Sequence, residues 1–518
     1  MVGLGFGLES YPSGSKAAIA IYAAGLIAFF VVYIVVYRLF FHPLAKIPGP
    51  KLAALTFLYQ TYYSFKDGSR FYKQVGLLHE KYGPIVRITP NEVSLSDPEN
   101  YEAIYHVRSR YTKDPRFYDA FGMEYASFTS CPNELHRLRR GPLNKFFSRA
   151  AVLELQNIVQ EKADKLCLLI TKNSKAGKML DIHHGCRALS VDVITQYMFN
   201  KCYDLLEAPD LGTYFFEMVR GIGPALWVFQ QWPELSIMNG LPQWMLKRMS
   251  PPLAQILRLQ EHAKQQILAT KADLDAGRVS KDNCKTIFHE LLTPNPEEGW
   301  IPPTPDQIKY ETYGILAAAA DTTGNGLTTG VYEVLKNPKI YAKLTAELEA
   351  AFPDPSAKME LTVLERLPYL TGVVNESLRL SFGVISRLPR IVPEGGAVFE
   401  GYTIPAGYTV SMSSWLLHRN EDYFPHAHEF IPERWALTSD KQKMWKAFVP
   451  FGKGSRMCVG MPLAFCEMYV TLASIFRRFK HLKGNELSEY DLLYDDFFAS
   501  HRPMDAVKFQ VIEQDLKE

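Results

Sequence analysis

A cysteine at position 458 stands in a glycine-rich loop immediately before a long apolar segment. The apolar periodicity of 461–479 predicts a helix. Three glycines permit a tight backbone before it, namely Gly452, Gly454 and Gly460. Cys458 is therefore expected at the mouth of that helix, where amide N–H groups and the helix dipole favour an anionic sulfur suited to ligating a metal. Cys466, two turns into the same helix, is interpreted as a core-packing residue.

The composition is that of a large folded protein. The chain has 518 residues, of which 47% are hydrophobic and 22% charged, and that much apolar surface excludes disorder for most of it. A net charge of +2 gives no support to nucleic-acid binding, which favours a strongly basic surface. The seven cysteines are scattered and contain no Cys-x-x-Cys pair, so neither a disulfide framework nor a structural zinc site is expected. An enzyme with reduced thiols fits these properties best.

The stretch 17–37 has 21 residues without a charge, bounded by Lys16 and Arg38. A helix of that length spans about 31 Å, enough to cross the apolar core of a bilayer. It is longer than the apolar part of a cleaved signal peptide, which is the alternative interpretation. Basic residues after the stretch predict that the bulk of the chain faces the cytoplasm. The predicted organisation is a short lumenal tail (1–16), a transmembrane anchor (17–37), a proline-rich hinge (38–52) and a catalytic domain (53–518).

The remaining sequence predicts a mainly α protein with small β-sheets. Helical periodicity is found at 135–172, 188–200, 251–275, 305–336, 338–351, 363–380 and 461–479. Short strand-like runs lie at 85–88, 93–95, 397–399, 409–412 and 507–512. Thr304 and Pro305 are a typical helix start, and the apolar middle of the helix that follows predicts a course through the interior.

The loop around Cys458 reads Phe451-Gly-Lys-Gly-Ser-Arg456-Met-Cys458-Val-Gly. It resembles the haem-binding loop of the cytochrome P450 family, Phe-x-x-Gly-x-Arg-x-Cys-x-Gly, and the resemblance extends over nearly the whole chain. The resemblance implies the cytochrome P450 fold in one large domain, preceded by a single transmembrane helix. It also implies haem b, with Cys458 as the axial iron ligand, Phe451 near the sulfur and Arg456 at a haem propionate.

Two further segments resemble the family elements that brace this loop. Glu376 and Arg379 share a face of a predicted helix, although such a pair by itself is usually a weak surface salt bridge. Downstream, 432–435 matches the family element Pro-Glu-Arg-Phe, with tryptophan in place of phenylalanine. The resemblance implies that Glu376, Arg379 and Arg434 form a buried structural triad.

The middle of the long helix reads Ala318-Ala319-Ala-Asp321-Thr322. Small residues let a flat macrocycle approach the backbone, whereas burying two polar side chains in an apolar stretch needs a reason. The segment resembles the family's oxygen-activation motif, in which an acid and an alcohol relay protons. The resemblance implies that Ala318 and Ala319 contact the haem and that Asp321 and Thr322 are catalytic. Ala319 departs from the glycine that is usual in the family.

The segment from His136 to Arg140 resembles the family helix that contacts the haem propionates, with His136 in place of the usual tryptophan. Arg390 stands where the family has another propionate arginine. A solvent-exposed basic helix face is the alternative for these positions. His183 and His184 are adjacent and point to different faces of a helix, so they are not expected to share a metal.

The segments that correspond to substrate contacts in the family are rich in aromatic residues and poor in charge. They lie at 114–130, 213–240, 382–386 and 497–500. Their composition favours a hydrophobic molecule that arrives from the membrane. By family analogy, the chain is similar to fungal members that oxidise terpenoid or polyketide intermediates of secondary metabolism.

Electrons are expected from a separate protein, because the sequence shows no flavin or nicotinamide site. The resemblance implies NADPH–cytochrome P450 reductase, a membrane-bound flavoprotein, with cytochrome b5 as a second donor, and a single-pass location in the endoplasmic reticulum membrane. Six residues are predicted to form a basic docking face: Arg137, Arg139, Lys145, Lys453, Arg477 and Arg478.

Two alternatives to a monooxygenase stay open at this point. One is a haem-thiolate isomerase or dehydratase that needs neither O2 nor a reductase, and the presence of Asp321 and Thr322 argues against it. The other is a non-catalytic haem sensor, which would not need a large aromatic pocket beside a proton relay.

Overall fold

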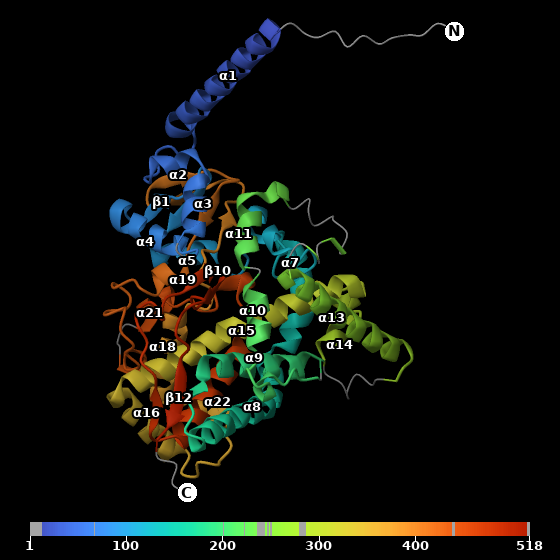
Figure 1. Cartoon of the computed structure of the whole chain (residues 1–518), viewed down its shortest axis with the longest axis vertical. Helices are drawn as coiled ribbons and strands as arrows, with labels where there is room; N and C mark the ends of the chain where they lie inside the picture. Colours follow the sequence, from blue (N-terminus) through green and yellow to red (C-terminus); the bar gives the residue numbers. More distant parts are fainter. Residues whose placement is uncertain are drawn as a thin grey trace.

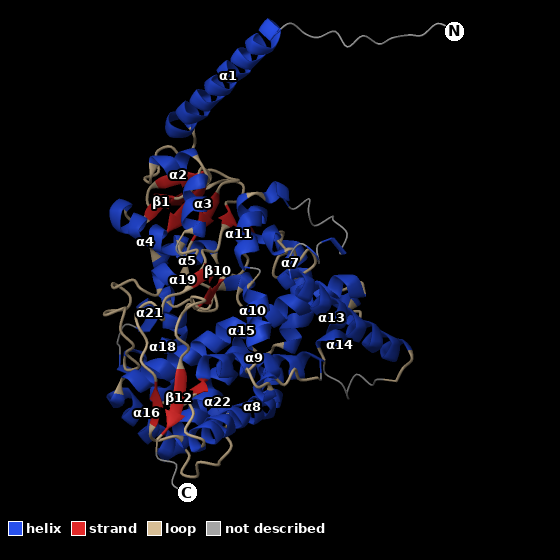
Figure 2. Cartoon of the chain, viewed as in Figure 1, coloured by secondary structure: helices blue, strands red, loops and turns tan. Residues whose placement is uncertain are grey.

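The computed structural model describes residues 13–514 except 67, 200, 222, 236–243, 246–247, 249–250, 279–285 and 438–440. Figure 1 shows a body dominated by helices, from which α1 (Ser13–Val36) projects at one end. In Figure 2, small groups of strands lie close to the base of α1 and toward the opposite end of the body. The predicted mainly α fold with small sheets is confirmed.

The apolar helix near the N-terminus extends further than predicted. α1 passes into a π-helical turn, Tyr37–Phe41, and together they form an apolar span from Ala17 to Phe41. The span has a mean hydropathy of 2.7 and is not buried against the body, so its length and composition allow it to cross a membrane. Residues 38–41, predicted as part of the hinge, belong to this helix.

Arg87 ties the segment after the apolar span to the body. Its buried guanidinium donates to the carbonyl oxygens of Arg38 at 3.1 Å, Leu44 at 3.4 Å and Pro90 at 2.9 Å. The Arg38 side chain in turn donates to the carbonyl of Leu55. The proline-rich segment is therefore fastened by hydrogen bonds at both ends before the chain enters α2 (Lys51–Leu55) and α3 (Leu58–Phe65).

Helices make up most of the body. The longer ones are α4 Phe71–Tyr82, α7 Asn133–Phe146, α8 Arg149–Lys175, α9 Ile182–Phe199, α10 Thr213–Arg220, α11 Gly223–Gln231, α13 Pro251–Asp275, α14 Ile287–Leu292, α15 Pro305–Lys336, α16 Pro338–Ala351, α18 Pro368–Ser381, α21 Lys441–Ala447 and α22 Met461–Arg478. Single turns are α5 Tyr101–Ile104, α6 Pro115–Tyr118, α17 Leu361–Leu364, α19 Ser414–Leu417 and α20 Arg434–Leu437. The predicted helix 135–172 is divided into α7 and α8 because the Ser148 hydroxyl caps a new helix by accepting from the Ala151 amide.

The strands are short. Their bounds are β1 Ile85–Arg87, β2 Glu92–Leu95, β3 Thr112–Lys113, β4 Leu180–Asp181, β5 Arg390–Ile391, β6 Ala397–Phe399, β7 Tyr402–Ile404, β8 Thr409–Ser411, β9 Leu482–Gly484, β10 Asp495–Phe497, β11 Ala499–His501 and β12 Gln510–Glu513. The largest sheet has the order β1-β2-β8-β5-β3, with β2 and β8 parallel and Val93 opposite Val410. β4, β12 and β9 form a second sheet, and β6–β7 and β10–β11 are hairpins.

The predicted long helix α15 runs through the middle of the body and packs against α9, α13, α18 and α22. Pro305 occupies its first turn, and the Gln307 side chain accepts from the Thr304 amide at 2.9 Å. Almost every residue from 320 to 331 is buried. Asp321 is therefore buried in the interior, and Thr322 beside it is only partly buried.

Candidate active site

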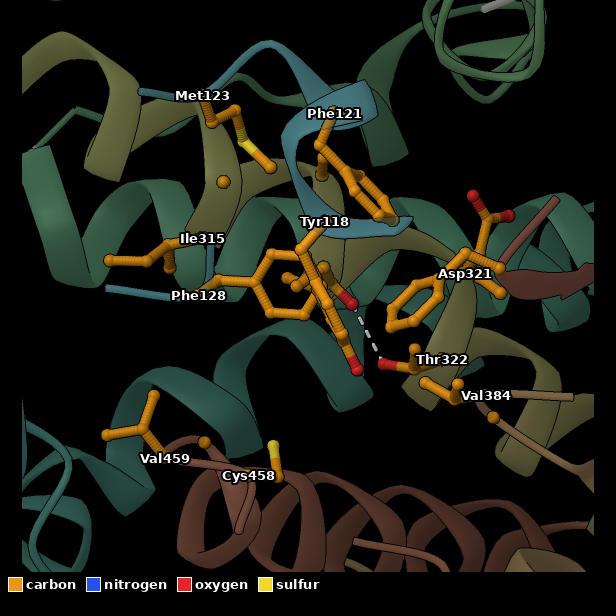
Figure 3. Close-up of a pocket in the computed structure, with 18 of the residues that line it drawn as sticks. Tyr118, Phe121, Met123, Phe128, Ile315, Asp321, Thr322, Val384, Cys458 and Val459 are labelled. Atoms are coloured by element: carbon orange, nitrogen blue, oxygen red, sulfur yellow. Dashed lines mark hydrogen bonds between the residues drawn. The ribbon is translucent and has the colours of Figure 1, made fainter. Parts of the chain in front are cut away.

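A cavity of about 770 Å³ separates the middle of α15 from the loop that carries Cys458. Figure 3 shows the Cys458 sulfur pointing from its loop into this space, with Thr322 and several aromatic side chains across from it. Ala318, Ala319 and Thr322 line the cavity from α15, and Phe451 lines it from the cysteine loop. A volume of this size is typical of a site that encloses a small molecule.

The backbone of the loop aims the Cys458 sulfur at the cavity. The Cys458 amide donates to the Phe451 carbonyl at 2.9 Å, which folds the loop back on itself just before α22. Gly454 has a φ of +75°, and a Cβ there would meet the His106 backbone at 2.5 Å, so the loop requires glycine at this position. Cys466 is fully buried in the main hydrophobic core, as predicted.

Burial raises the pKa of the Cys458 thiol. The backbone N–H of Gly460, the charge of Arg140 and the backbone N–H of Met461 act in the opposite direction and favour the thiolate. The two amides lie at the mouth of α22, as expected from the sequence, whereas Arg140 reaches the site from α7. A bound cation at the sulfur would remove the remaining penalty of burying the negative charge.

One wall of the cavity is cationic. The four predicted propionate contacts all line it: His136, Arg140, Arg390 and Arg456. Lys113 of β3 joins them, and burial together with the charges of Arg390 and Arg456 holds its pKa well below the usual range. Burial and the neighbouring cations lower the pKa of His136 to about 2, so its imidazole is neutral. Lys113 was missed in the sequence because a lysine in a two-residue strand carries no pattern.

This wall fits the two carboxylates of the haem that the resemblance implies. Buried cations are unfavourable without counter-anions. The Arg456 guanidinium donates to the carbonyls of Ser130 and Cys131 and to the Asn133 side chain. Its buried Nε, however, has no hydrogen-bond partner in the described part of the chain. Two propionates would supply the missing charge and acceptors, and Cys458 would supply the iron ligand from the same cavity.

The predicted triad residues meet in the interior. Arg379 donates to both carboxylate oxygens of Glu376, at 2.9 and 2.7 Å, and both side chains are fully buried. Arg434 Nε lies 3.1 Å from Glu376 Oε1. The Trp435 indole N–H donates to that same oxygen at 2.9 Å. The tryptophan that departs from the family pattern therefore adds a donor to the buried carboxylate.

His418 connects this triad to the cysteine loop. Arg379 Nη1 donates to the His418 carbonyl at 2.9 Å, and His418 Nδ1 lies 2.9 Å from the Arg379 carbonyl. His418 Nε2 accepts from the amide of Val449, just before Phe451, at 3.0 Å. Burial lowers the pKa of His418 to about 3, so the neutral ring donates through one nitrogen and accepts through the other. A lone histidine far along the chain gave no sequence signal for this link.

Asp321 and Thr322 are neighbours with different surroundings. Thr322 lines the cavity, and its hydroxyl donates to the Ala318 carbonyl at 2.8 Å, the dashed line in Figure 3. Asp321 is buried in an ion pair with Arg187 of α9, and His501 Nδ1 lies 3.9 Å from its second oxygen. The Asp321 carboxylate points away from the Thr322 hydroxyl in Figure 3. Arg187 and His501 come from distant segments that no local motif marks.

Aromatic side chains cover the cavity on the side of α15. Those from the predicted substrate segments are Tyr118, Phe121, Phe128, Phe229, Phe497 and Phe498. Phe215 and Phe216, also expected there, pack into the main core instead, and the Arg187 guanidinium lies 3.9 Å from the centre of the Phe216 ring. Residues 222 and 236–240 of the predicted segment 213–240 lie outside the described residues.

The predicted basic docking face is wrong at Arg139 and Arg477. Arg139 is buried and donates to the Glu124 carbonyl and the Ser130 hydroxyl. Arg477 is buried and donates to the carbonyl of Phe352 at 2.5 Å. Both arginines hold loops from inside, which a count of basic residues on a helix does not reveal. The other four members of the predicted face lie in ion pairs: Arg137, Lys145, Lys453 and Arg478.

The adjacent histidines have separate partners. His183 Nδ1 lies 3.2 Å from the Thr328 hydroxyl, and His184 Nδ1 lies 2.7 Å from the Asp181 carboxylate. His183 therefore bonds to α15 and His184 to β4, so the two rings have different neighbours.

Known proteins resemble this chain over most of its length. A sequence model of the family described as Cytochrome P450 matches residues 48–499. A cytochrome P450 monooxygenase of Ascocoryne sarcoides is 36% identical, with 92% of this chain and 95% of the relative covered. A tryptophan 6-hydroxylase of Fusarium equiseti is 34% identical, with 92% and 93% covered. An N-acetyltryptophan 6-hydroxylase of Emericella nidulans is also 34% identical, with 90% and 92% covered. Because the family match extends from the end of the proline-rich segment to the hairpin β10–β11, this chain belongs to the cytochrome P450 family.

Proposed function

We propose that the chain is a haem-thiolate monooxygenase that hydroxylates or otherwise oxidises a hydrophobic small molecule, using O2 and electrons that a reductase delivers from NADPH. The observation that carries the proposal is the Cys458 sulfur facing Thr322 across a cavity roofed by aromatic rings. Haem with a thiolate ligand supplies the chemistry of O–O cleavage when it is bound. The relatives named above, which are monooxygenases and hydroxylases, support the same class.

The proposed cofactor contacts follow from the cavity lining. Cys458 would hold the iron, and Phe451 of the same loop lines the cavity with it. His136, Arg140, Arg390 and Arg456 hold the propionates, with the neutral His136 donating one N–H. Ala318 and Ala319 have no side chain beyond Cβ, so α15 can approach the flat face of the macrocycle.

The proposed catalytic residues manage protons on the side of the cavity across from Cys458. The Thr322 hydroxyl, now bonded to the Ala318 carbonyl, can donate into the cavity when it accepts a proton in return. Asp321 supplies protons from the interior and is held by Arg187. The triad of Glu376, Arg379 and Arg434 acts structurally, by keeping the cysteine loop in place through His418.

The proposed substrate is a terpenoid or polyketide intermediate of fungal secondary metabolism. A cavity lined by phenylalanine and tyrosine rings favours an apolar molecule or an aromatic ring. Two of the relatives are named as hydroxylases of tryptophan or N-acetyltryptophan. An aromatic amino-acid derivative is therefore the second candidate.

The proposed electron donor is NADPH–cytochrome P450 reductase, with cytochrome b5 as an auxiliary donor. The apolar span from Ala17 to Phe41 would anchor the chain once in the endoplasmic reticulum membrane, with the body in the cytoplasm, because basic residues follow the span. Removing residues 1–41 should release most of the protein from microsomes, and unchanged sedimentation would contradict this anchor.

The central experiment reconstitutes the holoprotein with the reductase and a panel of terpenoid, polyketide and tryptophan-derived molecules under ¹⁸O2. One ¹⁸O atom in the product, with NADPH consumed, is the expected result. Product without ¹⁸O or NADPH use would indicate the isomerase or dehydratase. Haem binding without turnover of any substrate that perturbs its spectrum would favour a sensor.

A further inference from the structure

The segment 121–130, called here the roof loop, covers the cavity on the side of α15. Phe121, Met123 and Phe128 reach from it toward the space above Cys458 in Figure 3. The loop is folded by its own hydrogen bonds, since Thr129 and Ser130 donate to the Ala126 carbonyl at 3.2 and 2.9 Å. Its far end is held by Arg456, which donates to the Ser130 carbonyl. The position of the loop decides where these three side chains stand over the cavity.

Glu311 of α15 fastens the middle of the roof loop to the helix. Its two carboxylate oxygens accept from the Ser127 amide at 2.5 Å and from the Ser127 hydroxyl at 2.7 Å. Both residues are buried: Glu311 is 6% exposed and Ser127 is 5% exposed. Hydrogen bonds to a buried carboxylate are among the stronger ones in proteins, and losing the acceptor leaves a buried amide unpaired.

A second contact lies one turn further along the same face of α15. A Cβ at Gly314 would lie 3.3 Å from the Met123 sulfur and 4.0 Å from the Ala126 methyl group. The loop therefore rests directly on the helix at Gly314, while Glu311 fixes it along the helix axis. Glu311 lies three turns before Thr322 on α15. Among the described residues, both of its carboxylate oxygens accept hydrogen bonds from Ser127 alone.

We propose that Glu311 is the positioning residue for the roof loop, and that its bond with Ser127 sets the size and shape of the molecules that the cavity accepts. The inference rests on the proposed function, because the loop matters for specificity only if a ligand stands between it and the haem. Glu311 acts through Phe121, Met123 and Phe128 and is not itself required for haem binding. A preordered loop raises affinity for ligands large enough to touch it and leaves smaller ligands unaffected.

The test compares two nitrogen ligands of haem iron, imidazole and 4-phenylimidazole, in spectral titrations of the full-length holoprotein. Imidazole is the smaller ligand, whereas 4-phenylimidazole adds a ring that we expect to contact the roof loop. Glu311→Ala should weaken 4-phenylimidazole binding about tenfold while imidazole binding stays within about twofold. Ser127→Ala keeps the backbone bond and should show the same selectivity change at about threefold. Glu311→Gln, which retains one acceptor, should fall between wild type and Glu311→Ala.

Asp192→Asn is the matched control. Asp192 of α9 is also a buried carboxylate that accepts from two loop amides, those of Leu205 at 2.7 Å and Leu206 at 3.0 Å, but it does not line the cavity. Its variant should lose stability without changing the ratio of the two dissociation constants.

An unchanged ratio in Ser127→Ala and the Glu311 variants would overturn the inference, as would an equal change in Asp192→Asn. If Glu311→Ala fails to fold, Ser127→Ala and Glu311→Gln decide the matter alone. A wild-type protein that binds neither ligand would instead count against the proposed function.

Discussion

Arg187 of α9 and Asp321 of α15 form an ion pair inside the protein. The Asp321 carboxylate points away from the hydroxyl of Thr322 (Figure 3). The side chains of Arg187 and Asp321 are only 7% and 4% exposed to solvent. A buried pair of this kind is weakly stabilising while intact and costly to break from one side. The acid and the alcohol of the proposed relay therefore point in different directions: the Thr322 hydroxyl lies on the cavity side, and the Asp321 carboxylate lies against Arg187.

Thr322→Ala should separate electron consumption from product formation. The variant loses the hydroxyl on the cavity side but no buried charge, so haem content and substrate-induced spectral shifts should stay at wild-type levels. NADPH use should continue while product per NADPH falls by about 10²-fold, if the general acid–base contribution is typical. Product, NADPH and peroxide are measured together. If the variant formed as much product per NADPH as the wild type, the relay would have to run through another group, with Thr323 the next candidate.

Asp321→Asn should slow NADPH use itself, because proton supply becomes limiting. The substitution also leaves Arg187 buried without its counter-charge, at a cost of about 3–5 kcal/mol in stability. The double variant Arg187→Met, Asp321→Asn removes that cost and serves as the control. If the double variant regained both stability and wild-type NADPH consumption, Asp321 would be a structural partner of Arg187 and nothing more.

Cys458→Ala should abolish the red-shifted absorption band that reduced haem-thiolate proteins show with CO, because no neutral ligand supplies thiolate donation. Cys466→Ala is the matched control, since that thiol lies in the core and away from the cavity. The band should survive in the control. Its survival in Cys458→Ala would remove this residue from the iron.

Glu376→Gln should yield little holoprotein, because it leaves Arg379 and Arg434 buried against a neutral amide. Trp435→Phe removes one donor from the same carboxylate and should cost only about 1–3 kcal/mol, with haem still incorporated. Haem content per protein and urea unfolding measure the two effects. Equal haem content in Glu376→Gln and wild type would mean that the triad does not brace the cysteine loop.

The elements and site residues that could be predicted are those whose signals are local. The bounds of α15 follow from Thr304, Pro305 and an apolar run, and the loop of Cys458 follows from its glycines. The partners across the fold could not be predicted. Arg187 for Asp321, His418 for Arg379 and Lys113 on the cationic wall each depend on chain segments brought together only by packing.

The predicted basic docking face failed for a different reason, because two of its arginines are buried. Arg139 and Arg477 look like surface residues in the sequence, because arginine is seldom fully buried. Each is buried because loop carbonyls replace water around its guanidinium, Glu124 for Arg139 and Phe352 for Arg477. Residue type alone predicts that an arginine is exposed, and it therefore fails at these two buried positions.

Glu467 of α22 predicts a dependence of stability on pH. It is 2% exposed, and the Ser190 hydroxyl donates to it at 2.7 Å. Burial raises the pKa of its carboxyl to about 8, from an ordinary value of 4.5. Between those two values the folded protein binds more protons than the unfolded chain, so this group's contribution to stability is full below pH 4.5 and is lost as pH rises toward 8. The variant Glu467→Gln cannot ionise at this position, so its free energy of unfolding should not fall in this way. Unfolding in urea is followed by tryptophan fluorescence at several values between pH 5 and pH 8. The free energy of unfolding of the wild type should fall by up to about 1.4 kcal/mol per pH unit relative to the variant. Parallel curves for the two proteins would mean that Glu467 is already ionised in the fold, with a counter-charge or water beside it.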